Sequence, residues 1–125
     1  MFEKYVMFKS IKKLFIKPRL ESEAFEAYFN KLPDNLEVSW FRDGNFIIGN
    51  IRSDGYEFMT QGKSAQEFID MVNNAVFSVY EIPEEYSELI LKNKKYIPHQ
   101  EEFAKLNNAA VKKSVFQSQK FLQSA

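Results

Sequence analysis

The stretch TQGKSAQEFIDMVNNAV, from Thr60 to Val76, decides the fold, because it predicts the end of a strand, a glycine turn and the start of a helix. Ser64-Ala65-Gln66-Glu67 has the form of a capping box. In that motif the Ser64 hydroxyl accepts a hydrogen bond from the Glu67 amide, while the Glu67 carboxylate returns to the Ser64 amide. The sequence therefore predicts a helix over residues 65–80.

The predicted helix is amphipathic. We expect Asp70, Asn73 and Asn74 to face outward and the apolar residues to form one stripe against a sheet. The stripe consists of Ala65, Phe68, Ile69, Val72, Ala75, Val76 and Val79.

Three strands are predicted before this helix. LEVSWF alternates, so Leu36, Val38 and Trp40 face one way and their neighbours the other. Asp43-Gly44-Asn45 predicts a turn into FIIGNI, which makes 36–51 an antiparallel hairpin, and Ser53-Asp54-Gly55 predicts a second turn into YEFMTQ. Gly49 within the second strand indicates a bulge or a close approach by another group.

The flanking segments favour helices. The apolar spacing predicts a short helix in ESEAFEAYFNKLPDN that ends at Pro33, and another helix over residues 101–125. Residues 88–92 fit either a helical turn or an edge strand. Residues 1–20 have the pattern of a basic amphipathic helix, which we expect to dock on the domain; the alternative is a membrane surface.

These features predict an α+β fold. We expect a three- to four-stranded antiparallel sheet with one main amphipathic helix packed on it, flanked by N- and C-terminal helices. The expected divisions are a basic, helical extension over residues 1–35, a β-β-β-α domain over residues 36–98, and a helical tail over residues 99–125.

The composition is typical of a soluble globular protein. The chain has 125 residues, of which 45% are apolar and 27% charged, and the 13 Phe supply much of the area that a small core can bury. Cys is absent, which excludes disulfides, thiolate metal sites and a cysteine nucleophile. We find no signal-peptide pattern or apolar run long enough for a membrane span, so we expect a cytoplasmic protein without a membrane partner.

Charge is unevenly distributed, although 17 basic residues balance 17 acidic ones. Residues 1–20 hold six basic residues and one acid, whereas residues 21–60 hold eight acids and three basic residues. An acidic middle repels nucleic acid and suits a basic partner, and a solvated surface explains it equally well.

The order of strands, turns and capped helix resembles the HicB family of antitoxin-like proteins. The resemblance covers residues 36–98. Its motifs are Trp40-Phe41-Arg42-Asp43-Gly44, Phe46–Ile51, Gly55, Thr60-Gln61-Gly62, Ala65-Gln66-Glu67-Phe68 and Tyr96-Ile97-Pro98. The chain departs from the family in having no proline between the second and third strands and about 35 residues ahead of the first strand.

The resemblance implies a partial ribonuclease H-like fold and a non-catalytic role. It implies a partner as well, a small basic HicA-like toxin that cleaves mRNA and whose active site the antitoxin covers. Many family members also bind their own operator through a C-terminal DNA-binding motif. Residues 101–125 show no clear ribbon-helix-helix or helix-turn-helix, so we do not expect operator binding.

Catalytic, cofactor and metal sites are not predicted. A ribonuclease H needs carboxylates that converge on two metal ions, whereas Asp43 and Asp54 fall in turns, where Asp is favoured for its local hydrogen bonds. His99 is the single histidine and has no second ligand nearby in sequence. Gly62-Lys63-Ser64 ends like a phosphate-binding loop, but Glu57 replaces the first glycine of that motif.

The sequence therefore predicts a protein-binding module. The candidate partner-binding residues are Trp40, Phe41, Asp54, Glu57 and Met59, as an aromatic patch on the sheet with acids beside it. Sheet aromatics are also common in cores. The alternatives are an orphan homo-oligomeric interaction protein and a metal-dependent nuclease; we expect homo-oligomers in either protein-binding case.

Overall fold

The computed structural model describes residues 23–93 and 96–120. The chain divides into two units, Met1–Lys31 and Leu32–Ala125. In the first unit residues 23–31 form the short helix expected before Pro33, with the rings of Phe25 and Phe29 stacked 6.4 Å apart. The prediction for residues 1–20 lies outside the described residues.

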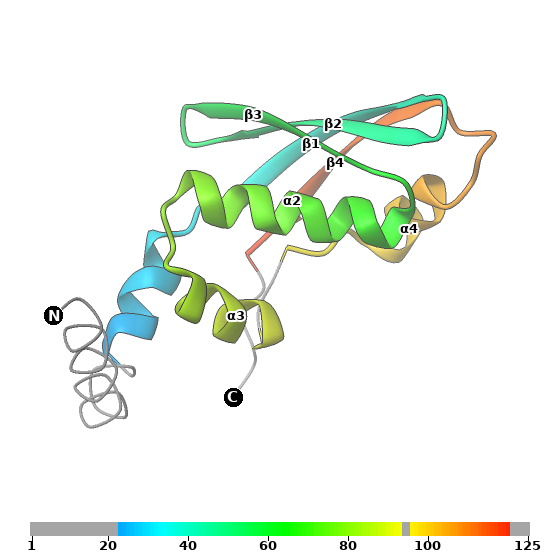
Figure 1. The fold of residues 1–125 in the computed structure, drawn as a ribbon. Helices are drawn as coiled ribbons and strands as arrows, with labels where there is room; N and C mark the ends of the chain where they lie inside the picture. Colours follow the sequence, from blue (N-terminus) through cyan, green and yellow to red (C-terminus); the bar gives the residue numbers. More distant parts are fainter. Residues whose placement is uncertain (1–22, 94–95, 121–125) are drawn as a thin grey trace, which may run out of the picture. The chain divides into compact units, whose positions relative to one another are not determined.

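The second unit is an α+β domain, as predicted. Strands β1 (Asn35–Asp43), β2 (Phe46–Ser53) and β3 (Tyr56–Gly62) precede helices α2 (Ala65–Val79), α3 (Glu84–Asn93) and α4 (Gln100–Leu106), and β4 (Lys113–Gln119) follows. The strands form one antiparallel sheet in the order β3-β2-β1-β4. Figure 1 shows α2, α3 and α4 on the same side of this sheet.

The two predicted turns close β1 to β2 and β2 to β3. Gly44 has φ +62°, as the first position of a two-residue hairpin turn requires. Asp54 and Gly55 have φ values of 40° and 84°, a pair of left-handed residues that suits an Asp-Gly loop. The alternation predicted for β1 is also confirmed, because Leu36, Val38 and Trp40 are all buried.

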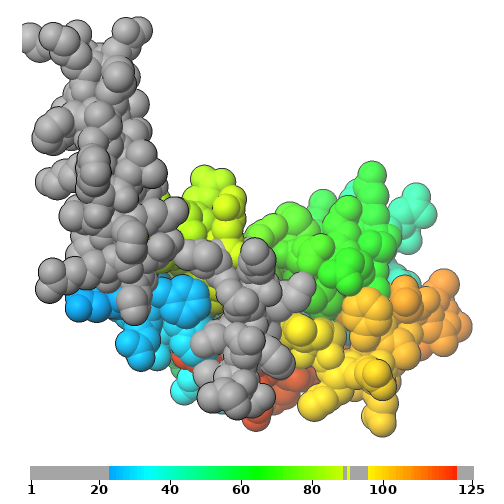
Figure 2. Space-filling view, turned by 90° about the horizontal axis from the view of Figure 1, so that it is seen from below, coloured from blue at the N-terminus to red at the C-terminus, as the bar shows by residue number. Residues whose placement is uncertain are grey.

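Helix α2 packs on the buried face of the sheet through the predicted stripe. The Ser64 side chain accepts from the Glu67 amide at 3.1 Å, but the Glu67 carboxylate accepts from the Lys63 amide at 2.9 Å, one residue earlier than expected. Gly49 is the predicted close approach, since a Cβ there would lie 2.5 Å from the Phe68 ring. The helix layer forms the surface in Figure 2, with α2 in green and the α4 region in yellow to orange.

Two predictions about side chains of α2 are wrong. Asn73 is 1% exposed and lies in the core, and Phe77 is buried although the predicted stripe omitted it. The Asn73 amide nitrogen donates to the Ile69 and Tyr96 carbonyls at 2.8 and 2.9 Å, and its oxygen accepts from the Tyr96 amide at 2.7 Å. Asn73 thus satisfies both backbone groups of Tyr96, whose hydroxyl in turn donates to the Pro33 carbonyl.

The helical tail predicted over residues 99–125 is also wrong between α4 and residue 120, and its last residues, 121–125, lie outside the described residues. Asn107 caps α4, and the Asn108 side chain accepts from the Ala110 amide at 3.0 Å, which turns the chain back toward the sheet. Lys113–Gln119 then pairs with β1 from Asn35↔Gln119 to Phe41↔Lys113. The tail is therefore part of the domain. Its strand pattern is weak because Phe116 is its one large apolar residue on the buried face, between Ser114 and Ser118.

Arg42 joins this C-terminal segment to β1. Its guanidinium donates to four backbone carbonyls, those of Val111 (2.7 Å), Lys105 (3.0 Å), Leu106 (2.6 Å) and Asn108 (2.8 Å). It also lies 5.2 Å from the centre of the Trp40 ring, within the range of a cation–π contact. Two of these carbonyls, those of Lys105 and Leu106, lie in the last turn of α4, where helical carbonyls lack the regular donor four residues on, and that of Asn108 follows the helix.

We predict that Arg42→Met destabilises the domain by about 2–4 kcal/mol, because the variant leaves several carbonyls without their charged donor. Urea unfolding measures this change. Arg52→Met is the matched control, since the Arg52 side chain is 64% exposed and 3.7 Å from Glu37, and its loss should cost at most about 0.5 kcal/mol. Equal effects of the two variants would contradict the role given to Arg42.

We predict that Asn73→Ala lowers the free energy of unfolding by about 2–3 kcal/mol, since two backbone groups of Tyr96 lose their partner in the core. Asn74→Ala, at the exposed neighbouring position, should change it by less than about 0.5 kcal/mol. Thermal or urea unfolding of both variants checks the difference. A fully stable Asn73→Ala protein would show that Tyr96 is held by other contacts.

Candidate docking face on the sheet

The side of the sheet away from the helices is called the open face here. Within the described part of the Leu32–Ala125 unit, no helix or strand covers it (Figure 1). Strand register places its side chains in rows that run across the sheet. The rows are Gln117–Glu37–Arg52–Glu57, then Val115–Ser39–Asn50–Met59, then Lys113–Phe41–Ile48–Gln61.

The row Gln117–Glu37–Arg52–Glu57 is called the charged row, because its last three residues alternate in charge. The Arg52 guanidinium lies 3.7 Å from the Glu37 carboxylate, and the Asn50 amide donates to the Glu57 carboxylate at 2.7 Å. A hollow of about 400 Å³ lies at this end of the sheet, beside the β2–β3 turn, and Asp54 and Tyr56 also line it. Its acids outnumber its one cation, Arg52, so this end of the open face favours basic groups.

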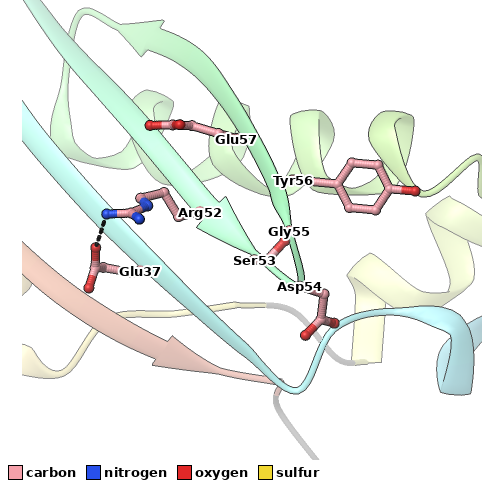
Figure 3. A pocket seen from close by; sticks show the side chains of 7 residues that line it. All are labelled: Glu37, Arg52, Ser53, Asp54, Gly55, Tyr56 and Glu57. Carbon is pink, nitrogen blue, oxygen red and sulfur yellow. Dashed lines mark ion pairs between the residues drawn. The ribbon is translucent and has the colours of Figure 1, made fainter.

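The side chains around this hollow do not converge. Figure 3 shows Glu37 and Arg52 facing each other, Glu57 extending in the same direction as Arg52 from the neighbouring strand, and Asp54 and Tyr56 directed to other sides of the turn. A catalytic site would need several of these groups directed at one reacting atom. The hollow is bordered on the open face by Glu37, Arg52 and Glu57, with Asp54 and Tyr56 at the turn.

A second hollow of about 560 Å³ lies over the next two rows and is called the apolar groove. The residues that line it are Ser39, Trp40, Phe41, Asn50, Lys113, Ser114 and Val115. Phe41 is 44% exposed and Val115 55%, while Met59, in the same row as Val115, is 62% exposed. Exposed apolar side chains gathered on one face are typical of protein interaction sites.

The structure separates the predicted partner-binding residues. Phe41, Glu57 and Met59 lie on the open face, and Asp54 lies in the adjoining turn. Trp40 borders the apolar groove, but its side chain is 2% exposed and lies on the face that packs against the helices, so it does not belong to the exposed aromatic patch that was predicted. Adjacent residues of a strand point to opposite faces, so Trp40 and Phe41 cannot belong to one patch.

Sequence reasoning missed Ile48, Lys113 and Val115. Ile48 alternates with the buried Ile47 and Gly49, so the period of two in FIIGNI was the available signal. Lys113 and Val115 were missed because their segment was expected to be helical. Within the second unit the predicted acidic middle is likewise not one surface, because Asp43 and Asp54 lie at different turns.

A metal pair built on Asp43 and Asp54 is excluded by their positions. The two residues flank β2, which is 8 residues long, so they are separated by about 25 Å at roughly 3.3 Å per residue. Two-metal sites place their ions about 4 Å apart. Within residues 23–93 and 96–120, no three His, Cys, Asp or Glu side chains gather closely enough to hold an ion. His99 is the exposed N-cap residue of α4 and makes no side-chain capping bond.

Beneath the charged row, two tyrosines link the sheet to the helix layer. The Tyr80 and Ser53 hydroxyls share a buried hydrogen bond of 2.8 Å, and the Tyr80 ring meets the Tyr56 ring edge-on at 5.2 Å. Burial raises the pKa of Tyr80, although the hydrogen bond with Ser53 partly opposes this shift. Burial also raises the pKa of Tyr96.

Comparisons with protein-family models, curated proteins and solved structures give no match to this chain. None of the helices in the described ranges has the length and apolar character needed to cross a bilayer. The candidate site is therefore defined by its geometry and charge.

We predict a loss of stability at alkaline pH. A tyrosine whose pKa is higher in the folded state stabilises the fold below its unfolded pKa of about 10, and this contribution is lost as pH rises through the folded value. The free energy of unfolding should therefore fall above about pH 10, and fall less steeply in Tyr96→Phe. Urea titrations across this range test it; equal slopes for the two proteins would contradict it.

Proposed function

We propose that the chain is a non-catalytic, HicB-like antitoxin whose open face binds and occludes a small basic, mRNA-cleaving HicA-like toxin. The observation that carries the proposal is the juxtaposition on one uncovered sheet face of the apolar groove and the charged row. The HicB-like motifs between residues 36 and 98 supply the class of partner, and such a complex would act in the cytoplasm.

The two parts of the face would do different work in such a complex. An apolar side chain of the toxin would enter the groove between Phe41 and Val115, where both apolar walls are already exposed. Buried apolar anchors of this kind carry most of the affinity of an interface. Basic groups beside that anchor would meet Glu37, Glu57 and Asp54, which would speed association and orient the partner.

The nuclease alternative has weaker support. The separation of Asp43 from Asp54 removes the carboxylate pair on which it depended, and the acids of the charged row are already engaged with Arg52 and Asn50. A sheet face with apolar and acidic character is also unsuited to holding a polyanionic RNA backbone.

The test is binding of the full chain to a small basic HicA-like protein, measured by calorimetry. We predict that Phe41→Ala weakens binding by about 10- to 30-fold, as the loss of an anchor does, and that Glu57→Lys weakens it about 10-fold with a steeper loss at low salt. Asp70→Lys is the matched control for charge, because Asp70 is an exposed acid on α2. Unchanged affinity in both open-face variants would refute the proposed face.

A further inference from the structure

Strand β4 is at the edge of the sheet, and its register with β1 shows which of its backbone groups have no partner in the sheet. In an antiparallel ladder, residue pairs that exchange hydrogen bonds alternate with pairs that do not. The Arg42 amide donates to the Lys112 carbonyl at 2.8 Å and the Lys120 amide to the Asp34 carbonyl at 2.7 Å, one just beyond each end of the β1–β4 ladder. The even-numbered residues of β4 therefore bond to β1.

The backbone N–H and C=O groups of the odd-numbered residues of β4 must then point away from β1, outward in the plane of the sheet. These residues are Lys113, Val115, Gln117 and Gln119, and all four side chains are exposed. Within the described ranges, no other element pairs with this edge. A free strand edge is a template for a further strand, and proteins usually protect it with a proline, a bulge or charged side chains. In β4 the pairing is continuous, proline is absent, and the one charge is at its first residue.

We propose that β4 pairs antiparallel with β4 of a second copy, about a two-fold axis at Phe116, to give a continuous eight-stranded sheet across the dimer. This axis sets Lys113 against the partner's Gln119 and Val115 against the partner's Gln117. Every outward-facing residue of β4 then finds a backbone partner. The charged Lys113 side chains lie at opposite ends of the new ladder, where they do not repel each other.

The sequence of β4 also selects this register. An axis at Val115 would leave Gln119 without a strand residue opposite it, and an axis at Gln117 would do the same to Lys113. A shift by a single residue would place the open face of one copy beside the helix-covered face of the other. The axis at Phe116 is thus the one that uses the whole edge and keeps both open faces on the same side.

The other edge of the sheet is less suited to self-pairing. By the same alternation, the outward residues of β3 are Glu57, Met59 and Gln61, a shorter set that includes an acid. The Thr60 hydroxyl donates to the Met71 carbonyl at 3.5 Å, so α2 runs beside this edge. A second copy is therefore expected at β4. The dimer does not depend on the proposed antitoxin role, and it would place two apolar grooves on one continuous surface.

Sedimentation equilibrium of the full chain alone tests the proposal. We expect twice the 14.7 kDa chain mass for the natural sequence and a monomer for Val115→Pro, which removes an outward-pointing amide without touching the β1 ladder. Gln61→Pro is the matched control, because it removes an outward-pointing amide from β3, and it should remain a dimer. A monomeric natural chain, or a dimeric Val115→Pro protein, would overturn the proposal.

Cross-linking tests the register even if the proline variant fails to fold. The chain lacks cysteine, so single replacements give unambiguous disulfides. A mixture of Val115→Cys and Gln117→Cys should oxidise to a heterodimer, because these positions face each other across the axis, whereas each variant alone should cross-link much more slowly. Efficient cross-linking of Val115→Cys with itself, or none in the mixture, would refute the axis at Phe116.

Discussion

The domain depends on the hydrogen bonds that the Arg42 guanidinium donates at the end of α4. The acceptors are the carbonyls of Lys105 and Leu106 in the last turn of the helix and of Asn108 just after it. These hydrogen bonds hold the end of α4 and the loop after it against the end of β1, which sets where β4 begins. Without these hydrogen bonds β4 would pair only weakly with β1, because Phe116 is its one large buried apolar residue. Because β4 completes one side of the sheet, Arg42 also determines where the apolar groove and the free edge lie.

Much of the domain was predictable because local signals agreed with the tertiary structure. The capping box at Ser64, the two glycine turns and the alternation in β1 each specify a conformation within a few residues. Gly49 predicts a bulge or a close approach, and the structure shows the close approach, by the Phe68 ring. Strands β1 to β3 and helix α2 therefore followed from the sequence.

Two of the wrong predictions, for Asn73 and for the C-terminal strand, have the same physical cause, which is that polar residues acquire partners from distant segments. Asn73 appears as an outward residue in a helical pattern, yet it pairs with the backbone of Tyr96 in the core. The C-terminal strand could not be recognised from its own pattern, because its ladder depends on contacts that Arg42 makes across the domain. Trp40 was misplaced for another reason: its aromatic character was given more weight than the alternation that already assigned it to the core.

One face of the sheet packs against the helices and forms the core, and the open face is the proposed binding surface. The central claim, that the open face is the docking surface, is tested most directly by methyl NMR of the chain during titration with the proposed basic partner. We predict that the signals of Ile48, Met59 and Val115 shift while those of Val72 and Val76, buried under the sheet, stay in place. Shifts concentrated on the exposed Met71 of α2, with the open-face methyls unchanged, would contradict the account.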